Sequence, residues 1–160
     1  MPKRTNKTKA YNLCLWTDAS YKVKHKQCHV AGLAYLVPIE MDEISEVNLI
    51  MHFSKRIKRL VNSTFEVELI AVKVLLQRVL KRIPSLLKMF KIPELVLFCD
   101  NRPVIESLRS GNCDDGFAYP DLLLVRQHLS RFQITPKWIE SEKQKADVGT
   151  KLILEKTRGC

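Results

Sequence analysis

The hydrophobic pattern of this chain changes its period near residue 63, and that change restricts the folds it can adopt. The first part holds three short, β-prone apolar runs: Tyr11 to Thr17, Val30 to Val37 and Val47 to Phe53. Consecutive strands of this kind predict an antiparallel meander. From Phe65 to Ile83 the apolar residues recur at steps of three and four, which predicts one long amphipathic helix ending before Pro84.

Strands and helices alternate in the second half of the chain. Leu95 to Cys99 is a continuous apolar run, the pattern of a buried parallel strand. The other predicted elements are a short helix from about Pro103 to Arg109, a helix from about Pro120 to Arg131, a strand from Ile134 to Ile139 and a helix from Gln144 to Glu155. A meander followed by alternation predicts a single α/β domain, with one mixed sheet and helices on its faces.

The composition is that of a globular protein. With 160 residues, 46% of them hydrophobic, the chain can form one domain with its own core. We assign this domain to residues 11–156 and expect residues 1–10 to be a flexible basic tail. No apolar run approaches the roughly 20 residues that cross a bilayer. The five cysteines are odd in number and form no CxxC pair, which favours reduced thiols and an intracellular protein, cytoplasmic or nuclear.

The net charge of +10 is large for a chain of this size. The basic residues gather in four clusters: Lys3 to Lys9, Lys22 to Lys26, Lys55 to Arg59 and Lys143 to Lys151. An anionic polymer is the natural partner of such a surface. Charge alone leaves open the simpler interpretation that the clusters are solvated faces and a disordered tail.

Four carboxylates stand where they could share a metal. Asp18 and Asp100 each end an apolar run, Glu68 lies on the apolar face of the long predicted helix, and Asp147 lies in the last predicted helix. Strand ends are a usual place for ligands in open α/β sheets. Because a carboxylate near a core is costly without a cation, four converging carboxylates predict bound divalent metal.

Each of these acids also has an ordinary interpretation. Asp18 and Asp100 could start turns, and Asp147 could simply favour a helix N-terminus. Glu68 could pair with a buried Lys or Arg. Taken singly these interpretations are sufficient, but all four must hold at once if there is no metal site.

Only one of the two glutamates in Phe65-Glu-Val-Glu68 is expected to serve such a site. Ser63 and Glu66 have the spacing of a capping box, in which each side chain bonds the other's backbone N–H. Glu68 lies two residues on, about 200° further round the helix, where no capping role exists. Asp114 and Asp115, beside glycines, are interpreted as turn residues, and Trp16 and Trp138 as packing residues of strands.

Four segments, in order along the chain, carry a resemblance to a known family. They are Thr17-Asp-Ala-Ser20, Asn62-Ser-Thr-Phe-Glu-Val-Glu-Leu69, Cys99-Asp-Asn101 and Trp138-Ile-Glu-Ser-Glu-Lys-Gln-Lys-Ala-Asp-Val-Gly-Thr-Lys151. The chain resembles the ribonuclease H domain of copia-type LTR retrotransposon polyproteins from about Tyr11 to Leu154. The resemblance implies a ribonuclease H-like fold with a five-stranded mixed sheet, made of an antiparallel meander and parallel strands, and with helices on both faces.

The resemblance also implies an activity. Asp18, Glu68, Asp100 and Asp147 would be the catalytic and metal-binding set for two Mg²⁺ or Mn²⁺ ions, which serve hydrolysis of the RNA strand of RNA–DNA hybrids. A reverse transcriptase domain of the same polyprotein is a possible partner, and virus-like particles a possible location. The residues expected to contact nucleic acid are Lys55, Arg56, Lys58, Arg59, Asn62, Lys143 and Lys145.

Two departures from related enzymes keep a second function open. Cellular ribonucleases H usually carry a histidine before the last helix, but residues 140–146 contain none. The loop between the helices ending near Arg109 and starting near Pro120 is too short for the extra basic helix that some relatives use to grip hybrid. The alternative is a weakly active or inactive module that binds nucleic acid or supports assembly with a reverse transcriptase. An integrase or resolvase would carry different motifs.

Overall fold

The computed structural model describes residues 10–22, 27–39 and 48–143, and this part of the chain contains five strands and four α-helices. The strands are β1 (Ala10–Lys22), β2 (Gln27–Pro38), β3 (Asn48–Ile57), β4 (Lys91–Cys99) and β5 (Ile134–Trp138). The helices are α1 (Thr64–Val79), α2 (Ile83–Met89), α3 (Arg102–Ser110) and α4 (Tyr119–Phe132), followed by a short 3-10 helix over Ser141–Lys143.

The five strands form one mixed sheet in the order β3-β2-β1-β4-β5. Neighbours are antiparallel from β3 to β1 and parallel from β1 to β5, which confirms the predicted meander and the mixed sheet. β1 is therefore central, and in the parallel pair with β4 its Trp16 stands opposite Phe98. The two rings stack with centroids 4.5 Å apart, so the prediction that Trp16 packs within the sheet is confirmed.

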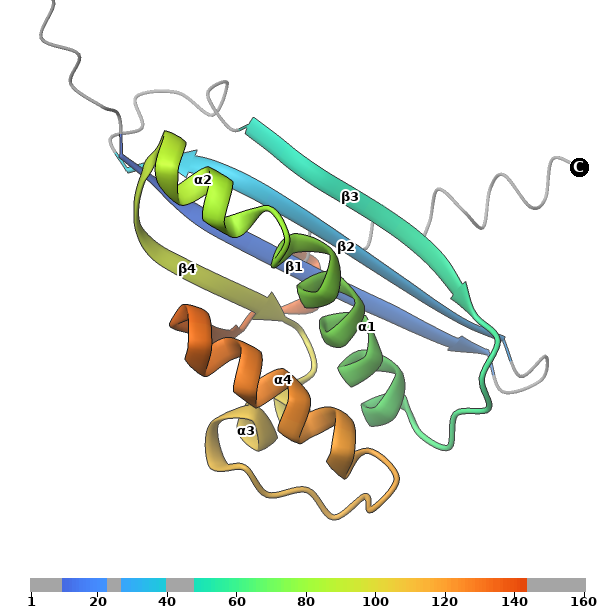
Figure 1. The fold of residues 1–160 in the computed structure, drawn as a ribbon. Helices are drawn as coiled ribbons and strands as arrows, with labels where there is room; N and C mark the ends of the chain where they lie inside the picture. The colour runs from blue at the N-terminus through green and yellow to red at the C-terminus, as the bar shows by residue number, and fades with distance from the viewer. Residues whose placement is uncertain (1–9, 23–26, 40–47, 144–160) are drawn as a thin grey trace, which may run out of the picture.

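Helix α1 lies across β1 and β2 and forms the centre of the core (Figure 1). Its buried Leu69, Leu75 and Leu76 belong to one hydrophobic cluster with fully buried strand residues such as Leu13 and Leu15. Each buried leucine contributes about 1.5–3 kcal/mol, so this helix is anchored firmly against the sheet. The helix predicted over 144–155 lies outside the described residues. None of the helices that the structure describes is long and apolar enough to span a bilayer.

The prediction of one long helix up to Pro84 is wrong, because two helices occupy that segment. α1 ends at Val79, a turn follows, and α2 begins at Ile83 with Pro84 in its first turn. Proline is tolerated there because the N–H it lacks has no partner inside a helix. The apolar period continued across the break because Ile83 is also fully buried, so the sequence pattern hid the turn.

The strands are longer than their apolar runs, and this changes the place of Asp18. β1 continues to Lys22 because its ladder with β2, which begins at Tyr11, extends past Asp18 opposite Ala31 and ends at Lys22 opposite Gln27. Asp18 therefore lies inside a strand, not at its end, and it does not start a turn. Asp100, in contrast, directly follows the last residue of β4, as predicted.

A network of ion pairs ties the segment before α1 to α1 and α4. Arg59 Nη2 contacts Glu66 Oε1 at 2.7 Å and Asp121 Oδ2 at 3.3 Å. Lys73 Nζ contacts Asp121 Oδ1 at 2.8 Å. Both carboxylates are buried, and both obtain cationic partners, so the network satisfies the charges that this helix junction encloses.

Glu66 performs its predicted capping role with one correction. The Glu66 N–H donates to Ser63 Oγ at 3.1 Å, as in a capping box. The Glu66 carboxylate, however, accepts from the backbone N–H of Asn62 at 3.0 Å and not from that of Ser63. Arg59 draws the carboxylate toward the preceding segment, which explains the altered partner.

We expect Arg59→Ala to lower the free energy of unfolding by about 1–3 kcal/mol, because it leaves buried Glu66 without its cation. Lys58→Ala is the matched control, since Lys58 is exposed and its loss should cost less than about 0.5 kcal/mol. Urea unfolding of both variants measures the difference. Equal stability of the two variants would show that the network contributes nothing.

Candidate metal centre

Three of the four predicted acids come from elements that meet at one place. The β1–β4 register ends at Trp16 opposite Phe98, so Asp18 and Asp100, each two residues further on, lie at the same level of neighbouring strands. Glu68 projects from the start of the second turn of α1, which packs on β1. The backbone N–H of Ala19 donates a hydrogen bond to Glu68, which ties the helix acid to the strand beside Asp18.

The donor atoms of this centre are close together. One carboxylate oxygen of Glu68, one of Asp100 and the Sγ atom of Cys99 all lie within 4.8 Å of one another. Cys99 Sγ donates weakly to Glu68 Oε2, at 4.0 Å. Asp18 is near enough for its charge to act on Glu68. Asp147 lies outside the described residues, so its place at this centre stays a prediction.

The electrostatics of Glu68 are those of an unneutralised buried acid. Burial is the main cause that raises its pKa from 4.5 to about 9, and the charges of Asp100 and Asp18 raise it further, while the Ala19 hydrogen bond acts in the opposite direction. Among residues 10–22, 27–39 and 48–143, no Lys or Arg forms an ion pair with it. The ordinary interpretation of Glu68, a buried ion pair, therefore has no partner in this part of the chain.

The donor set fits a hard divalent cation. Carboxylate oxygens are the ligands that Mg²⁺ and Mn²⁺ prefer, and a cation would relieve the repulsion among the three acids. Cys99 is the exception in this set. Burial is the main cause that raises the pKa of its thiol to about 12, so Cys99 is a neutral thiol at physiological pH.

Trp138 and Arg102 belong to the surroundings of Asp100, and the sequence interpretation missed both. The indole Nε1–H of Trp138 donates to the backbone carbonyl of Asp100 at 3.1 Å, and the Arg102 guanidinium lies 4.4 Å from the centre of the same indole ring. Trp138 is the last residue of β5 and is 39% exposed, and its ring packs against Arg102 on the face of the sheet, so it is not a core residue. The signal that could have placed Trp138 near Asp100 is the end of β5 beside the end of β4, since Trp138 stands opposite Cys99.

Asn101 fixes the chain that follows Asp100. Its side-chain oxygen accepts a hydrogen bond from the Val104 N–H at 3.1 Å and thereby caps the N-terminus of α3. The direction of the chain immediately after Asp100, a predicted metal ligand, is thus set by a helix cap. Asp115 likewise accepts from the N–H groups of Phe117 and Ala118, which confirms its interpretation as a turn residue.

The predicted nucleic-acid contacts have different surroundings. Lys55 and Arg56 lie on β3, next to Ser54. Asp18 stands opposite Ala31 on β2, and Ala31 stands opposite Ser54 on β3. Two strand spacings, roughly 10 Å, therefore separate Asp18 from Ser54. The residues of this set that are exposed and form no described ion pair are Lys55, Arg56, Lys58 and Asn62.

Arg59, in contrast, is engaged with Glu66 and Asp121, so its main contacts are inside the protein. Lys143 is exposed and lies 3.6 Å from Glu140 Oε2. Lys145 lies outside the described residues. The free basic surface near the acids is therefore the stretch from Lys55 to Lys58.

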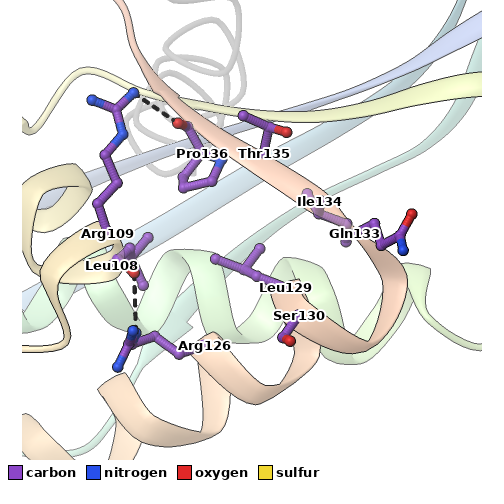
Figure 2. A pocket seen from close by; sticks show the side chains of 9 residues that line it. All are labelled: Leu108, Arg109, Arg126, Leu129, Ser130, Gln133, Ile134, Thr135 and Pro136. Atoms are coloured by element: carbon purple, nitrogen blue, oxygen red, sulfur yellow. Dashed lines mark hydrogen bonds between the residues drawn. The ribbon is translucent and has the colours of Figure 1, made fainter.

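A hollow of about 490 Å³ lies away from the acids, between α3, α4 and β5 (Figure 2). Figure 2 shows Arg109 donating to the carbonyl of Pro136 and Arg126 donating to that of Leu108, at 2.9 and 3.1 Å. No acid, histidine or cysteine is among its lining residues within the described chain. Both arginines hold backbone carbonyls, so this hollow is a feature of helix packing without groups for catalysis.

Comparison with known proteins identifies the fold. No protein-family model and no curated protein matches the chain. RNase H1 from the halophilic archaeon Halobacterium salinarum NRC-1 matches with a TM-score of 0.61 at 12% identity, over 84% of this chain and 90% of that one. LC11-RNase H1 in complex with an RNA/DNA hybrid matches with a TM-score of 0.64 at 11% identity, over 85% and 91%.

A viral protein shares the same domain fold. The foamy viral protease-reverse transcriptase in complex with an RNA/DNA hybrid matches with a TM-score of 0.59 at 11% identity, over 89% of this chain and 19% of that one. At these identities the likeness establishes the fold alone. This chain thus has the ribonuclease H fold that its sequence resemblance implied.

The raised pKa of Glu68 predicts a pH-dependent stability. Between about pH 4.5 and pH 9 the folded protein keeps a proton on Glu68 that the unfolded chain has lost, so metal-free stability should fall as pH rises through this window. Each pKa unit by which folding raises the pKa of Glu68 corresponds to about 1.4 kcal/mol of folding free energy. Glu68→Gln should remove this slope and stabilise the metal-free protein most at high pH.

Thermal unfolding in chelator from pH 5 to pH 9 measures the effect, with Glu106→Gln, an exposed glutamate of α3, as the control. Mg²⁺ should restore stability to the wild type at high pH, because the cation favours the ionised carboxylate, and it should do much less for Glu68→Gln. A slope unchanged by Glu68→Gln would contradict the electrostatic assignment.

Proposed function

We propose that this protein is a metal-dependent endoribonuclease that hydrolyses the RNA strand of RNA–DNA hybrids. Asp18, Glu68, Asp100 and Asp147 are the residues that would hold two Mg²⁺ or Mn²⁺ ions. The observation that carries the proposal is the burial of Glu68 beside Asp100 and Asp18 without a described cationic partner. The ribonuclease H fold supports it, as do the RNA/DNA hybrids bound by two of the matching structures.

The chemistry that bound divalent ions supply is Lewis acidity at the reacting phosphate. The protein's own residues prepare the site for it. Ala19 and Trp138 fix the positions of Glu68 and Asp100 through hydrogen bonds. Because α1 is anchored in the core, Glu68 stays beside Asp100 and Asp18 before any cation binds, so the ligand positions are already arranged.

Substrate binding is assigned to the basic surface beside the acids. Lys55, Arg56 and Lys58 stand at the β3 end of the site, with Asn62 close by in sequence, and Arg102 stands beside Asp100. Contacts of this kind go mainly to phosphates, so the hybrid would be recognised by backbone shape and 2′-hydroxyls, with little base reading.

We further propose that the chain is the ribonuclease H domain of a copia-type retroelement polyprotein, or a domesticated copy of one. The four matching segments support this origin, and the foamy viral match supports a reverse transcriptase as partner. The expected location is the cytoplasm or nucleus, including virus-like particles.

Purified protein with Mg²⁺ or Mn²⁺ should cleave the RNA strand of a labelled hybrid and leave duplex DNA intact. Asp100→Asn should reduce cleavage by at least about a hundredfold, since loss of a metal ligand exceeds the effect of losing its supporting partners. Asp114→Asn, which makes the same chemical change in an exposed turn, should cleave like the wild type. A wild type that is inactive with both metals would favour the inactive binding module.

Hybrid affinity should depend steeply on salt. Replacing Lys55, Arg56 and Lys58 together by Ala should flatten the log–log salt slope by about 0.9 for each phosphate that the variant no longer neutralises. The matched control replaces Lys81, Lys88 and Lys91, which are exposed on or beside α2 at the opposite end of the sheet (Figure 1). Filter binding between low and physiological salt measures both slopes, and equal slopes for the two triple variants would contradict the assigned surface.

A further inference from the structure

Cys99 brings a thiol into a group of oxygen donors. It is the last residue of β4, its side chain is fully buried, and its Sγ atom lies within 4.8 Å of carboxylate oxygens of Glu68 and Asp100. This is the one such group of three possible metal donors within the described chain. Mg²⁺ gains nothing from sulfur, whereas thiolate ligands select softer cations such as Zn²⁺ and Cd²⁺.

We propose that Glu68, Cys99 and Asp100 form a site for thiophilic divalent cations, and that Zn²⁺ or Cd²⁺ bound there blocks the hydrolytic activity. The inhibitory part of this inference rests on the proposed function, because it assumes that Mg²⁺ needs the same two carboxylates. The binding part does not depend on it.

The geometry favours this cysteine over the other described ones. Cys113 Sγ is engaged with the backbone carbonyl of Asp115 at 3.3 Å, and neither Cys14 nor Cys28 belongs to a group of three metal donors in the described chain. Cys99 instead already contacts Glu68 Oε2, so its sulfur points toward the acids.

Binding releases protons to solvent. The Cys99 S–H bond breaks as a sulfur–metal bond forms, and the Glu68 carboxyl group gives up its O–H proton where its oxygen binds the cation, with no change of oxidation state. Three protein donors leave one position of a tetrahedral Zn²⁺ site for water. Asp100 is only partly buried, so a cation can approach from its side. Because Glu68 and Asp100 are then occupied, a Mg²⁺ ion that needs these carboxylates is excluded.

Cadmium titration of the metal-free protein tests the binding directly. Coordination to Cys99 should produce the ultraviolet charge-transfer absorption of a cadmium thiolate, and Cys99→Ser and Cys99→Ala should both lose it. Cys113→Ser, which removes a half-buried thiol elsewhere, should keep it. Circular dichroism verifies that each variant is folded. In the wild type, excess Mn²⁺ should weaken the absorption because both cations use the same carboxylates.

Zinc inhibition of cleavage tests the consequence, expressed as the ratio of rates with and without Zn²⁺ for each variant. The Zn²⁺ concentration that halves the cleavage rate should be at least about tenfold higher for Cys99→Ser than for the wild type, since the thiolate is the ligand that selects zinc. Equal cadmium absorption in wild type and both Cys99 variants would overturn the proposed site, whereas absorption that Mn²⁺ does not affect would overturn the proposed exclusion of Mg²⁺ from the shared carboxylates.

The two proposals fail in distinguishable ways. A protein that shows the Cys99-dependent cadmium absorption but no cleavage with Mg²⁺ or Mn²⁺ would keep the thiophilic site and lose the proposed function. A protein that cleaves hybrid but shows equal zinc inhibition in wild type and Cys99→Ser would keep the function and overturn the proposed cause of inhibition.

Discussion

Glu68 is held against Asp100 and Asp18 in a position where its charge is poorly solvated, and no described lysine or arginine neutralises it. Without a cation, burial and the charges of Asp100 and Asp18 keep a proton on this carboxyl group, and it stays in place because Leu69, Leu75 and Leu76 fix α1 in the core. Such an arrangement is stable enough to fold and incomplete without a cation, which is the property that a metal centre requires.

The neighbouring Glu66 shows that the fold can neutralise a buried acid where no metal is needed. It lies on the same helix, two residues earlier, and it receives Arg59 at 2.7 Å and the backbone N–H of Asn62. Ion pairing therefore distinguishes Glu66, a structural charge, from Glu68, the proposed metal ligand, more clearly than burial does, since both are buried. A net charge of +10 makes the contrast sharper, because cations are abundant in this chain and yet none in the described part pairs with Glu68.

Much of this architecture could be predicted from local patterns. Periodicity located all five strands and the main helices, and the spacing of Ser63 and Glu66 identified the cap of α1. Local patterns failed where distant residues decide the structure. Asp121 is 62 residues from Arg59, so no local pattern could indicate that Arg59 is engaged inside the protein. The break before α2 was hidden because Ile83 continued the apolar period across it.

A crystal structure of the protein with Mn²⁺, using the anomalous signal of manganese, tests the central claim most directly. We expect anomalous peaks bounded by oxygens of Asp18, Glu68 and Asp100, with Asp147 as the further ligand that the sequence resemblance implies. Manganese-soaked crystals without a peak at this place, in which Glu68 instead pairs with a lysine or arginine, would contradict the metal centre and with it the nuclease.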